Sequence, residues 1–251
     1  MSQVELQHGA ATDVGLVREV NEDALLAAPP VFVVADGMGG HEGGDVASAI
    51  VVEEFARLAE AGYDPRNAVE AVRSALTASQ ERIRAYSEAQ RQGGIGRRRH
   101  AGTTAVVALL ADDDGPMWLL ANLGDSRIYR FAGGVLEQVS VDHSLVQELV
   151  DTGRLDPAAA ATHPKRNVIT RALGDPDGAE ADFFVLPVDA AERLLLCSDG
   201  VTGMLADDEV AAVLREAADP RDAADQLVAA AVAAGGEDNA TAVVIDVVGV
   251  P

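Results

Sequence analysis

The sequence predicts a single domain of the α+β class. Several apolar segments of strand length follow one another with short links, which favours antiparallel pairing, and long amphipathic helical segments separate these groups. No internal repeat and no linker divides the 251 residues, which suffice for one large domain with an ample core. We therefore expect residues 1–251 to form one domain.

The N-terminal half is predicted to begin with strands at residues 4–11, 25–28 and 31–35, which are short apolar runs separated by turn residues. Two segments with helical periodicity come next. Their apolar faces are formed by Ala47, Val51, Phe55 and Leu58, and by Val69, Val72, Leu76 and Ile83. Two such helices in succession predict a helical hairpin packed on a sheet.

The C-terminal half is predicted to contain more strands and two further long helices. Expected strands are 103–111, 117–123, 128–131, 135–140, 183–188, 193–197 and 241–247, and expected helices are 144–152, 208–217 and 221–234. After the helix at 144–152 the periodicity fades through Asn167, and Pro157 and Pro164 interrupt the segment. Residues 144–167 are therefore a candidate flap.

The composition excludes several classes of protein. With 19 basic and 41 acidic side chains the net charge is -22, which disfavours nucleic acid and anionic membranes as partners. The basic run Arg97-Arg98-Arg99-His100 is a local exception that could attract an acidic or phosphorylated partner. A single cysteine excludes an internal disulfide framework and a Cys-rich zinc site. No apolar stretch is long enough to span a membrane and no signal peptide is evident, so we expect a cytoplasmic protein.

Four aspartates lie where apolar runs stop or start. Asp36, Asp125 and Asp199 follow such runs, and Asp238 precedes the last one. Strands that end together would bring these carboxylates together, and a cluster kept ionised at neutral pH indicates bound hard cations such as Mg²⁺ or Mn²⁺. Taken singly, each aspartate is more typical of a turn residue that satisfies its own backbone, by roughly two to one.

Neighbouring residues strengthen the metal hypothesis. The glycine-rich run after Asp36 lacks the spacing of a nucleotide loop, but Gly37 allows its backbone carbonyl to approach an ion that Asp36 also touches. Arg18 precedes Glu22 and Asp23 and offers a planar bidentate donor for phosphate beside further carboxylates. An ordinary surface ion pair would explain Arg18 equally well.

An ordered series of short motifs spans almost the whole chain: Thr12-Asp13-x-Gly15-x-x-Arg18-x-x-Asn21-Glu22-Asp23, Asp36-Gly37-Met38-Gly39-Gly40, Gly102-Thr103-Thr104, Leu123-Gly124-Asp125-Ser126-Arg127, Asp142-His143-Ser144, Ile169-Thr170-Arg171-Ala172-Leu173-Gly174, Ser198-Asp199-Gly200 and Glu237-Asp238-Asn239-x-Thr241. In this set the chain resembles the metal-dependent Ser/Thr protein phosphatases of the protein phosphatase 2C (PPM) family, in their bacterial branch.

The resemblance implies a four-layer α-β-β-α sandwich of two antiparallel sheets flanked by helices, with two Mg²⁺ or Mn²⁺ ions at one end. Asp36 would bridge both ions, the Gly37 carbonyl would bind one, and Asp199 and Asp238 would hold the other. Glu22 and Asp23 resemble groups that act through bound waters.

By the same resemblance, Arg18 matches the phosphate-binding arginine, which completes the expected catalytic set with Asp36, Asp199 and Asp238. Asp125 together with Asp199 matches the site of a third, weaker ion in bacterial members. Residues 144–167 correspond to the flap that borders the substrate.

The implied chemistry needs no side-chain nucleophile. Two cations ~3.5–4 Å apart lower the pKa of a shared water and stabilise both oxygens of an in-line displacement, so a metal-bridging hydroxide would attack phosphorus directly. Cys197 then has a structural explanation as an apolar strand residue. Met38 stands where many eukaryotic relatives have histidine, so we expect a metal-bound water to protonate the leaving group.

The leading hypothesis is a phosphoserine/phosphothreonine protein phosphatase that opposes bacterial Ser/Thr kinases and acts as a monomer. Its partners would be phosphorylated proteins, including such a kinase. One alternative is a phosphatase dedicated to one partner phosphoprotein of a stress-response switch. A second is a non-catalytic metal-binding scaffold, which the full set of expected carboxylates disfavours. His143 and His163 flank the flap and could approach substrate, but partly buried structural histidines or solvated ones are favoured for both.

Overall fold

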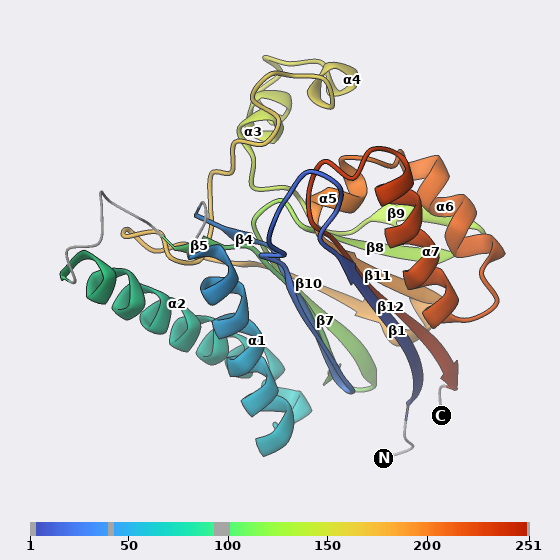
Figure 1. Cartoon of the computed structure of the whole chain (residues 1–251). Coiled ribbons are helices and arrows are strands. Elements are labelled where there is room, and N and C mark those ends of the chain that lie inside the picture. Colours follow the sequence, from blue (N-terminus) through green and yellow to red (C-terminus); the bar gives the residue numbers. More distant parts are fainter. Residues whose placement is uncertain (1–3, 40–42, 93–100, 250–251) are drawn as a thin grey trace.

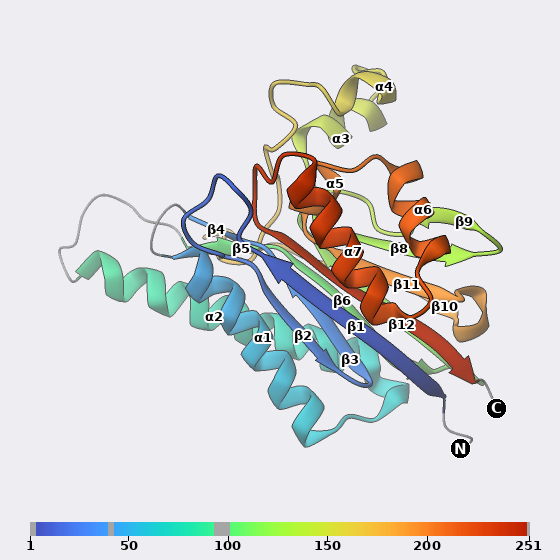
Figure 2. The same cartoon turned by 45° about the vertical axis from the view of Figure 1, so that its right-hand side comes forward.

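The computed structural model describes residues 4–39, 43–92 and 101–249, and its strands form two five-stranded antiparallel sheets. The first sheet contains both ends of the described chain. Its strands, in spatial order, are β1 (Glu5–Asp13), β12 (Ala240–Gly249), β11 (Arg193–Cys197), β8 (Arg127–Ala132) and β9 (Val135–Gln138). Figures 1 and 2 show β1 and β12 side by side, with the two termini at the same end of the molecule.

The second sheet is built mainly from the middle of the chain. Its spatial order is β10 (Asp182–Pro187), β7 (Pro116–Leu123), β6 (Ala105–Asp112), β3 (Val31–Ala35) and β2 (Ala24–Ala28). Every residue of β3 is buried, which explains its unbroken apolar sequence: a strand covered on both faces has no polar side.

Helices cover the outer face of each sheet, so the molecule has four layers (Figure 2). α1 (Gly44–Ala61) and α2 (Ala68–Gln92) lie on the second sheet, and α6 (Asp207–Glu216) and α7 (Pro220–Ala233) lie on the first. Shorter helical turns are α5 (Asp199–Thr202), η1 (Pro65–Asn67) and η2 (Val188–Ala190). The α-β-β-α sandwich expected from the sequence is confirmed.

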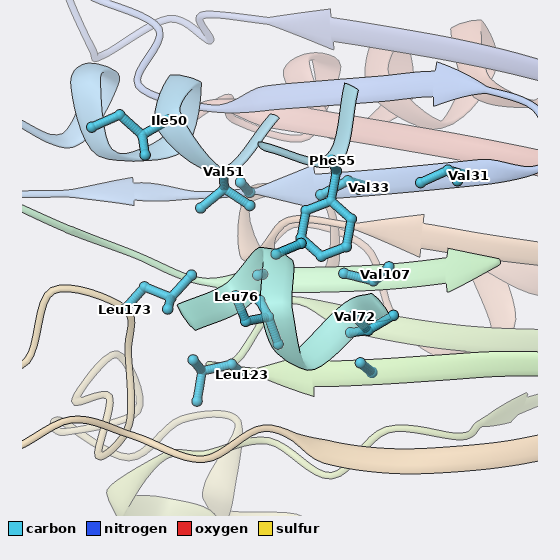
Figure 3. Packing of buried hydrophobic residues seen from close by; sticks show 14 of the residues in the cluster. Val31, Val33, Ile50, Val51, Phe55, Val72, Leu76, Val107, Leu123 and Leu173 are labelled. Carbon is cyan, nitrogen blue, oxygen red and sulfur yellow. The ribbon is translucent and has the colours of Figure 1, made fainter. Parts of the chain in front are cut away.

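Three hydrophobic clusters hold the layers together. In the cluster between the helical hairpin and the second sheet, Val51, Phe55 and Val72 point at Val33 and Val107 (Figure 3). A second cluster joins α6 and α7 to the first sheet. The third lies between the two sheets and is made of large side chains that exclude water completely, among them Phe32, Trp118, Ile128, Leu194 and Val243.

Two of the predicted elements needed correction. Val69 was assigned to the buried face of α2, but it is 42% exposed, and Ala68, Ala75 and Ser79 contribute to that face instead. The strand expected over 103–111 is divided. Its first part, β5 (Gly102–Thr103), pairs with β4 (Gly37–Met38) in a separate two-stranded sheet. The division falls at Thr104, whose backbone N–H donates to the Asp36 carbonyl over 2.9 Å.

The predicted flap stands apart from the sandwich in both views (Figures 1 and 2). It contains α3 (Leu145–Asp151), capped by Ser144, and a single turn, α4 (Pro157–Ala160), that the sequence analysis did not predict. An isolated bridge between Ser144 and Ile169 closes its base. Most of the segment between these two residues is exposed, so few core contacts hold it.

Two motifs from the sequence analysis lie wholly or partly outside the described residues. These are the basic run at residues 97–100 and residues 40–42 of the glycine-rich turn. Within the described ranges, none of the helices is both long enough and apolar enough to cross a lipid bilayer.

Candidate metal centre

The strand-end aspartates meet because of the sheet topology. β3 and β7 both pair antiparallel with β6, so they run in the same direction and Asp36 and Asp125 leave the second sheet at one edge. In the first sheet, β11 ends beside the start of β12, which brings Asp199 and Asp238 together. Stacking of the two sheets then places all four carboxyl groups near one another, and each of the other three acts electrostatically on Asp36.

Asp36 lies at the centre of this group. The pKa of its carboxyl is raised well above the ordinary value, first by burial and then by the negative charges of Asp23, Asp199, Asp125 and Asp238. Burial also raises the pKa of Asp199, with a contribution from Asp238, while a hydrogen bond with the Asp36 carboxyl lowers it. Without a cation, the two carboxyl groups therefore favour a shared proton over two adjacent charges.

Asp23 and Asp125 each have a buried carboxylate oxygen that is not hydrogen-bonded. Burial raises the pKa of Asp23 to about 7 and that of Asp125 to about 8. The Asp23 Oδ2 atom accepts from the Ser198 hydroxyl over 2.8 Å, but its Oδ1 atom, like Oδ1 of Asp125, has no hydrogen-bond partner in the described structure. Buried unpaired oxygens of this kind are costly unless something else binds them, and carboxylate oxygens are the ligands of hard divalent cations.

Glu22 and the Gly37 carbonyl converge beside Gly44, the first residue of α1. A Cβ atom on Gly44 would lie 2.7 Å from Glu22 Oε1 and 2.9 Å from the Gly37 oxygen, so only glycine leaves both oxygens where they are. Gly37 is equally constrained, since a Cβ there would lie 2.3 Å from the Gly44 carbonyl oxygen. The sequence analysis identified Gly37 and missed Gly44.

The carboxylates are nevertheless not preassembled as a cage. Among residues 4–39, 43–92 and 101–249, no three His, Cys, Asp or Glu side chains are already arranged as ligands of one metal ion. Asp238 is paired instead with Arg18, whose Nη2 atom lies 2.7 Å from Asp238 Oδ2. The donor set suits Mg²⁺ or Mn²⁺, because it consists of several carboxylates and a backbone carbonyl.

Arg18 lies at the border of the aspartate cluster and pairs with one of its members. The sequence suggested either a phosphate-binding guanidinium or an ordinary ion pair, and in this structure Arg18 forms an ion pair with Asp238, a candidate metal ligand. Both partners are partly exposed, at 49% for the Arg18 side chain and 33% for that of Asp238, so water weakens the pair. An incoming dianionic phosphate could compete for the same donor.

Several residues that position the aspartates were missed or given only a structural role in the sequence analysis. The Asp36 backbone N–H donates to Thr104 Oγ1, and Thr103 Oγ1 donates to the Asp36 carbonyl. The Ser198 hydroxyl, besides donating to Asp23, accepts the Thr241 backbone N–H. In the sequence, Ser126 follows Asp125 and Ser198 precedes Asp199. These neighbouring hydroxyl residues were the signal from which a positioning role could have been predicted.

His143 is buried, and both of its ring nitrogens have polar partners within the protein. Its Nδ1 atom accepts the Gly124 backbone N–H, and its Nε2 atom lies 3.1 Å from Asp182 Oδ2. This arrangement links the base of the flap to the turn that carries Asp125. The arrangement fits the structural role favoured from the sequence.

The family model described as Protein phosphatase 2C matches residues 17–234, a range that contains Arg18, Asp36, Asp125 and Asp199 and ends shortly before Asp238. The chain belongs to the protein phosphatase 2C family. Membership makes it a metal-dependent serine/threonine phosphatase that uses Mn²⁺ or Mg²⁺, as the motifs predicted.

Relatives in other bacteria agree with this classification of the phosphatase. "Serine/threonine phosphatase stp" of Listeria monocytogenes is 36% identical over 248 residues, which cover 94% of this chain and 93% of that protein. "Serine/threonine protein phosphatase PstP" of Mycobacterium tuberculosis is 37% identical over 245 residues, covering 97% of this chain and 45% of that protein.

Solved structures of this family match the architecture. The crystal structure of Mycobacterium tuberculosis PstP/Ppp superposes with a TM-score of 0.86 at 34% identity, covering 96% of this chain and 98% of that one. The PstP catalytic domain in complex with two manganese ions gives a TM-score of 0.83 at 34% identity, covering 97% and 99% of the two chains.

Proposed function

We propose that this phosphatase hydrolyses phosphoserine and phosphothreonine in proteins with water as the nucleophile, and that the aspartate cluster is its catalytic centre. The observation that carries the proposal is the convergence of Asp36, Asp199, Asp125 and Asp238, together with the unpaired buried oxygens of Asp23 and Asp125. Such an assembly gains stability when cations neutralise it.

In this proposal Asp36, the Gly37 carbonyl, Asp199 and Asp238 would hold two core ions, with Glu22 and Asp23 acting through waters. Asp125 and Asp199 would hold a third. When bound, the ions would supply an activated water and neutralise charge on the phosphoryl group. Glu22 Oε1 and the Gly37 carbonyl oxygen both border Gly44, which places Glu22 to orient a water beside that carbonyl.

A cysteine nucleophile conflicts with the environment of Cys197. The thiol is completely buried, and burial raises its pKa to about 12, so almost none is thiolate at neutral pH. No phosphoenzyme is therefore expected. Arg18, released from Asp238, would bind the phosphate oxygens, and Thr103 and Thr104 would keep the Asp36 backbone fixed.

We further propose that residues 1–251 act as one catalytic domain, as a cytoplasmic monomer that opposes a Ser/Thr kinase in signal transduction. The net charge of -22 makes copies of the chain repel each other, which supports the monomer. Kinases phosphorylate proteins where ATP is available, which supports a cytoplasmic location for the phosphatase. The flap, residues 144–167, stands apart from the sandwich with most of its residues exposed and would border the substrate.

The direct test is turnover of a phosphothreonine peptide by the metal-free protein with and without added Mn²⁺. We expect release of phosphate only with metal, and no ³²P label on the protein after acid quenching during turnover. A stable phosphoenzyme, or turnover at full rate in excess chelator, would contradict the proposed mechanism. Binding of Mn²⁺ without any hydrolysis would instead support the scaffold alternative.

Asp125 provides a prediction for the third ion. Asp125→Ala should retain tight Mn²⁺ binding, because the core donors remain, yet lower kcat by about 10- to 100-fold. Calorimetric Mn²⁺ titration and phosphopeptide kinetics would measure the two effects separately. If Asp125 only shapes the turn after β7, the variant should lose thermal stability and keep its kcat, which would remove the third ion from the proposal.

A further inference from the structure

Asn239 is a buried amide whose hydrogen bonds all reach one loop. Its Nδ2 atom donates to the Val14 carbonyl over 2.9 Å and to the Val20 carbonyl over 3.0 Å. Its Oδ1 atom accepts the Glu22 backbone N–H over 2.8 Å. Both amide hydrogens and the amide oxygen are therefore hydrogen-bonded, and Asn239 as a whole is only 5% exposed.

The loop held in this way, residues 14–22 between β1 and β2, has little packing of its own. Leu16, Val17 and Val20 are 70%, 66% and 54% exposed, so the loop contributes almost nothing to the hydrophobic clusters. The Leu16 N–H also donates to the Gly236 carbonyl over 2.8 Å, and Asn21 Nδ2 donates to Thr12 Oγ1 over 2.8 Å. At the Glu22 end, the Glu22 carbonyl accepts from the Ser48 hydroxyl over 2.6 Å. Asn239 differs from these ties because one side chain joins Val14 and Val20, the residues on either side of the segment that carries Arg18.

Arg18 lies in the middle of this loop, and its guanidinium reaches Asp238, the residue next to Asn239 in sequence. The position of the arginine relative to the aspartate cluster is consequently set through Asn239. The long, half-exposed Arg18 side chain loses rotamer freedom when it binds a ligand. If the backbone of its loop is already fixed, no additional backbone entropy is lost on binding.

We infer that Asn239 is the positioning residue for Arg18, holding the loop so that the guanidinium meets a phosphate bound at the aspartate cluster. The inference rests on the proposed role of Arg18 in phosphate binding. The side-chain amide of Asn239 hydrogen-bonds backbone groups only. It acts on substrate affinity through the loop, and it leaves Asp36 and Asp199 unaffected.

The first measurement uses Asn239→Asp, which keeps the acceptor for the Glu22 N–H and removes both donors to Val14 and Val20. We expect the KM for a phosphopeptide and the Ki for inorganic phosphate to rise about tenfold or more, with kcat within about threefold. Asn239→Ala removes the same donors without adding charge. A similar rise in both variants excludes repulsion by the new carboxylate as the cause.

A readout independent of catalysis is hydrogen exchange in the metal-free protein. Loss of the clamp should speed amide exchange in residues 14–20 by about tenfold, while β12 keeps its protection. Unchanged exchange in this loop in both Asn239 variants would overturn the inference whatever the kinetics.

The deciding experiment is a double-mutant cycle with Arg18→Ala. If Asn239 acts through Arg18, adding Asn239→Asp to Arg18→Ala should raise the phosphate Ki by no more than about twofold further. Gln80→Glu is the matched control, because the Gln80 amide clamps another loop by accepting the Gly174 N–H over 2.6 Å and donating to the Asp175 carbonyl over 2.7 Å. It should leave KM and Ki unchanged.

The outcomes separate the inference from the proposed function. If Arg18→Ala leaves the phosphate Ki unchanged, the proposed role of Arg18 fails and the inference fails with it. If Arg18→Ala weakens phosphate binding but the Asn239 variants do not, only the inference fails. Fully additive effects in the cycle, or an equal rise in Ki for Gln80→Glu, would also overturn it.

Discussion

Replacing Asp36 with asparagine should lower kcat/KM for a phosphopeptide by at least about 1,000-fold, which corresponds to about 4 kcal/mol of lost transition-state stabilisation. The charges of four other aspartates act on the Asp36 carboxylate, which is also the proposed ligand shared by both core ions. The same variant should weaken Mn²⁺ binding. In the metal-free protein it should raise Tm, because one source of repulsion is removed.

Asp112→Asn provides the matched control. Asp112 also ends a strand, β6, and accepts a backbone N–H from Gly115, but it leaves the sheet at the end opposite to Asp36. Its replacement should change neither turnover nor Mn²⁺ binding. Near-normal turnover in a folded Asp36→Asn variant would remove Asp36 from the proposed centre, and a loss of Tm in the metal-free variant would contradict the electrostatic argument.

The metal-free protein should become less stable as the pH rises from about 5 to 8. Folding raises the pKa of Asp23 to about 7 and that of Asp125 to about 8, while the unfolded chain titrates at the ordinary value of 3.8. Between these values the folded state binds more protons than the unfolded state, so the free energy of unfolding falls with pH until both groups are ionised. We expect a fall in Tm of about 5–10 °C.

Saturating Mn²⁺ should reverse this trend, because the ions bind the ionised carboxylates of the folded state and their affinity increases with pH. Melting curves at several pH values in chelator and in excess Mn²⁺ would measure both slopes. Asp23→Asn should flatten the slope in chelator. A metal-free Tm that rises between pH 5 and 8 would show that the cluster is not the dominant titrating group.

The regular part of the fold could be predicted because burial leaves a clear mark on the sequence. β3 and β11 are buried along their whole length and are uninterrupted apolar runs, so their ends, and hence Asp36 and Asp199, could be located closely. The division of residues 102–112 into β5 and β6 could not be predicted. It results from hydrogen bonds between Thr104 and Asp36, which are 68 residues apart.

The site was predictable in its residues but not in its contacts. Strand ends and motif order identified the aspartates, while the pairing of Arg18 with Asp238 joins residues 220 positions apart and has no local signature. Gly44 was missed for a similar reason: its lack of a side chain matters only because Glu22 and Gly37 approach it in three dimensions. Whether these residues bind metal as expected stays a prediction.

The division of the aspartates between two sheets has a mechanical meaning. Asp36 and Asp125 belong to one sheet and Asp199 and Asp238 to the other, and between the sheets lies a dry layer that includes Phe32, Trp118 and Ile128. Ions bound by all four would cross-link the sheets at one end, in the way a disulfide joins two segments. The distance between the two sheets then becomes a determinant of metal affinity. A change of side-chain volume in the layer between them, far from the metal centre, would alter the distance between the aspartates of one sheet and those of the other.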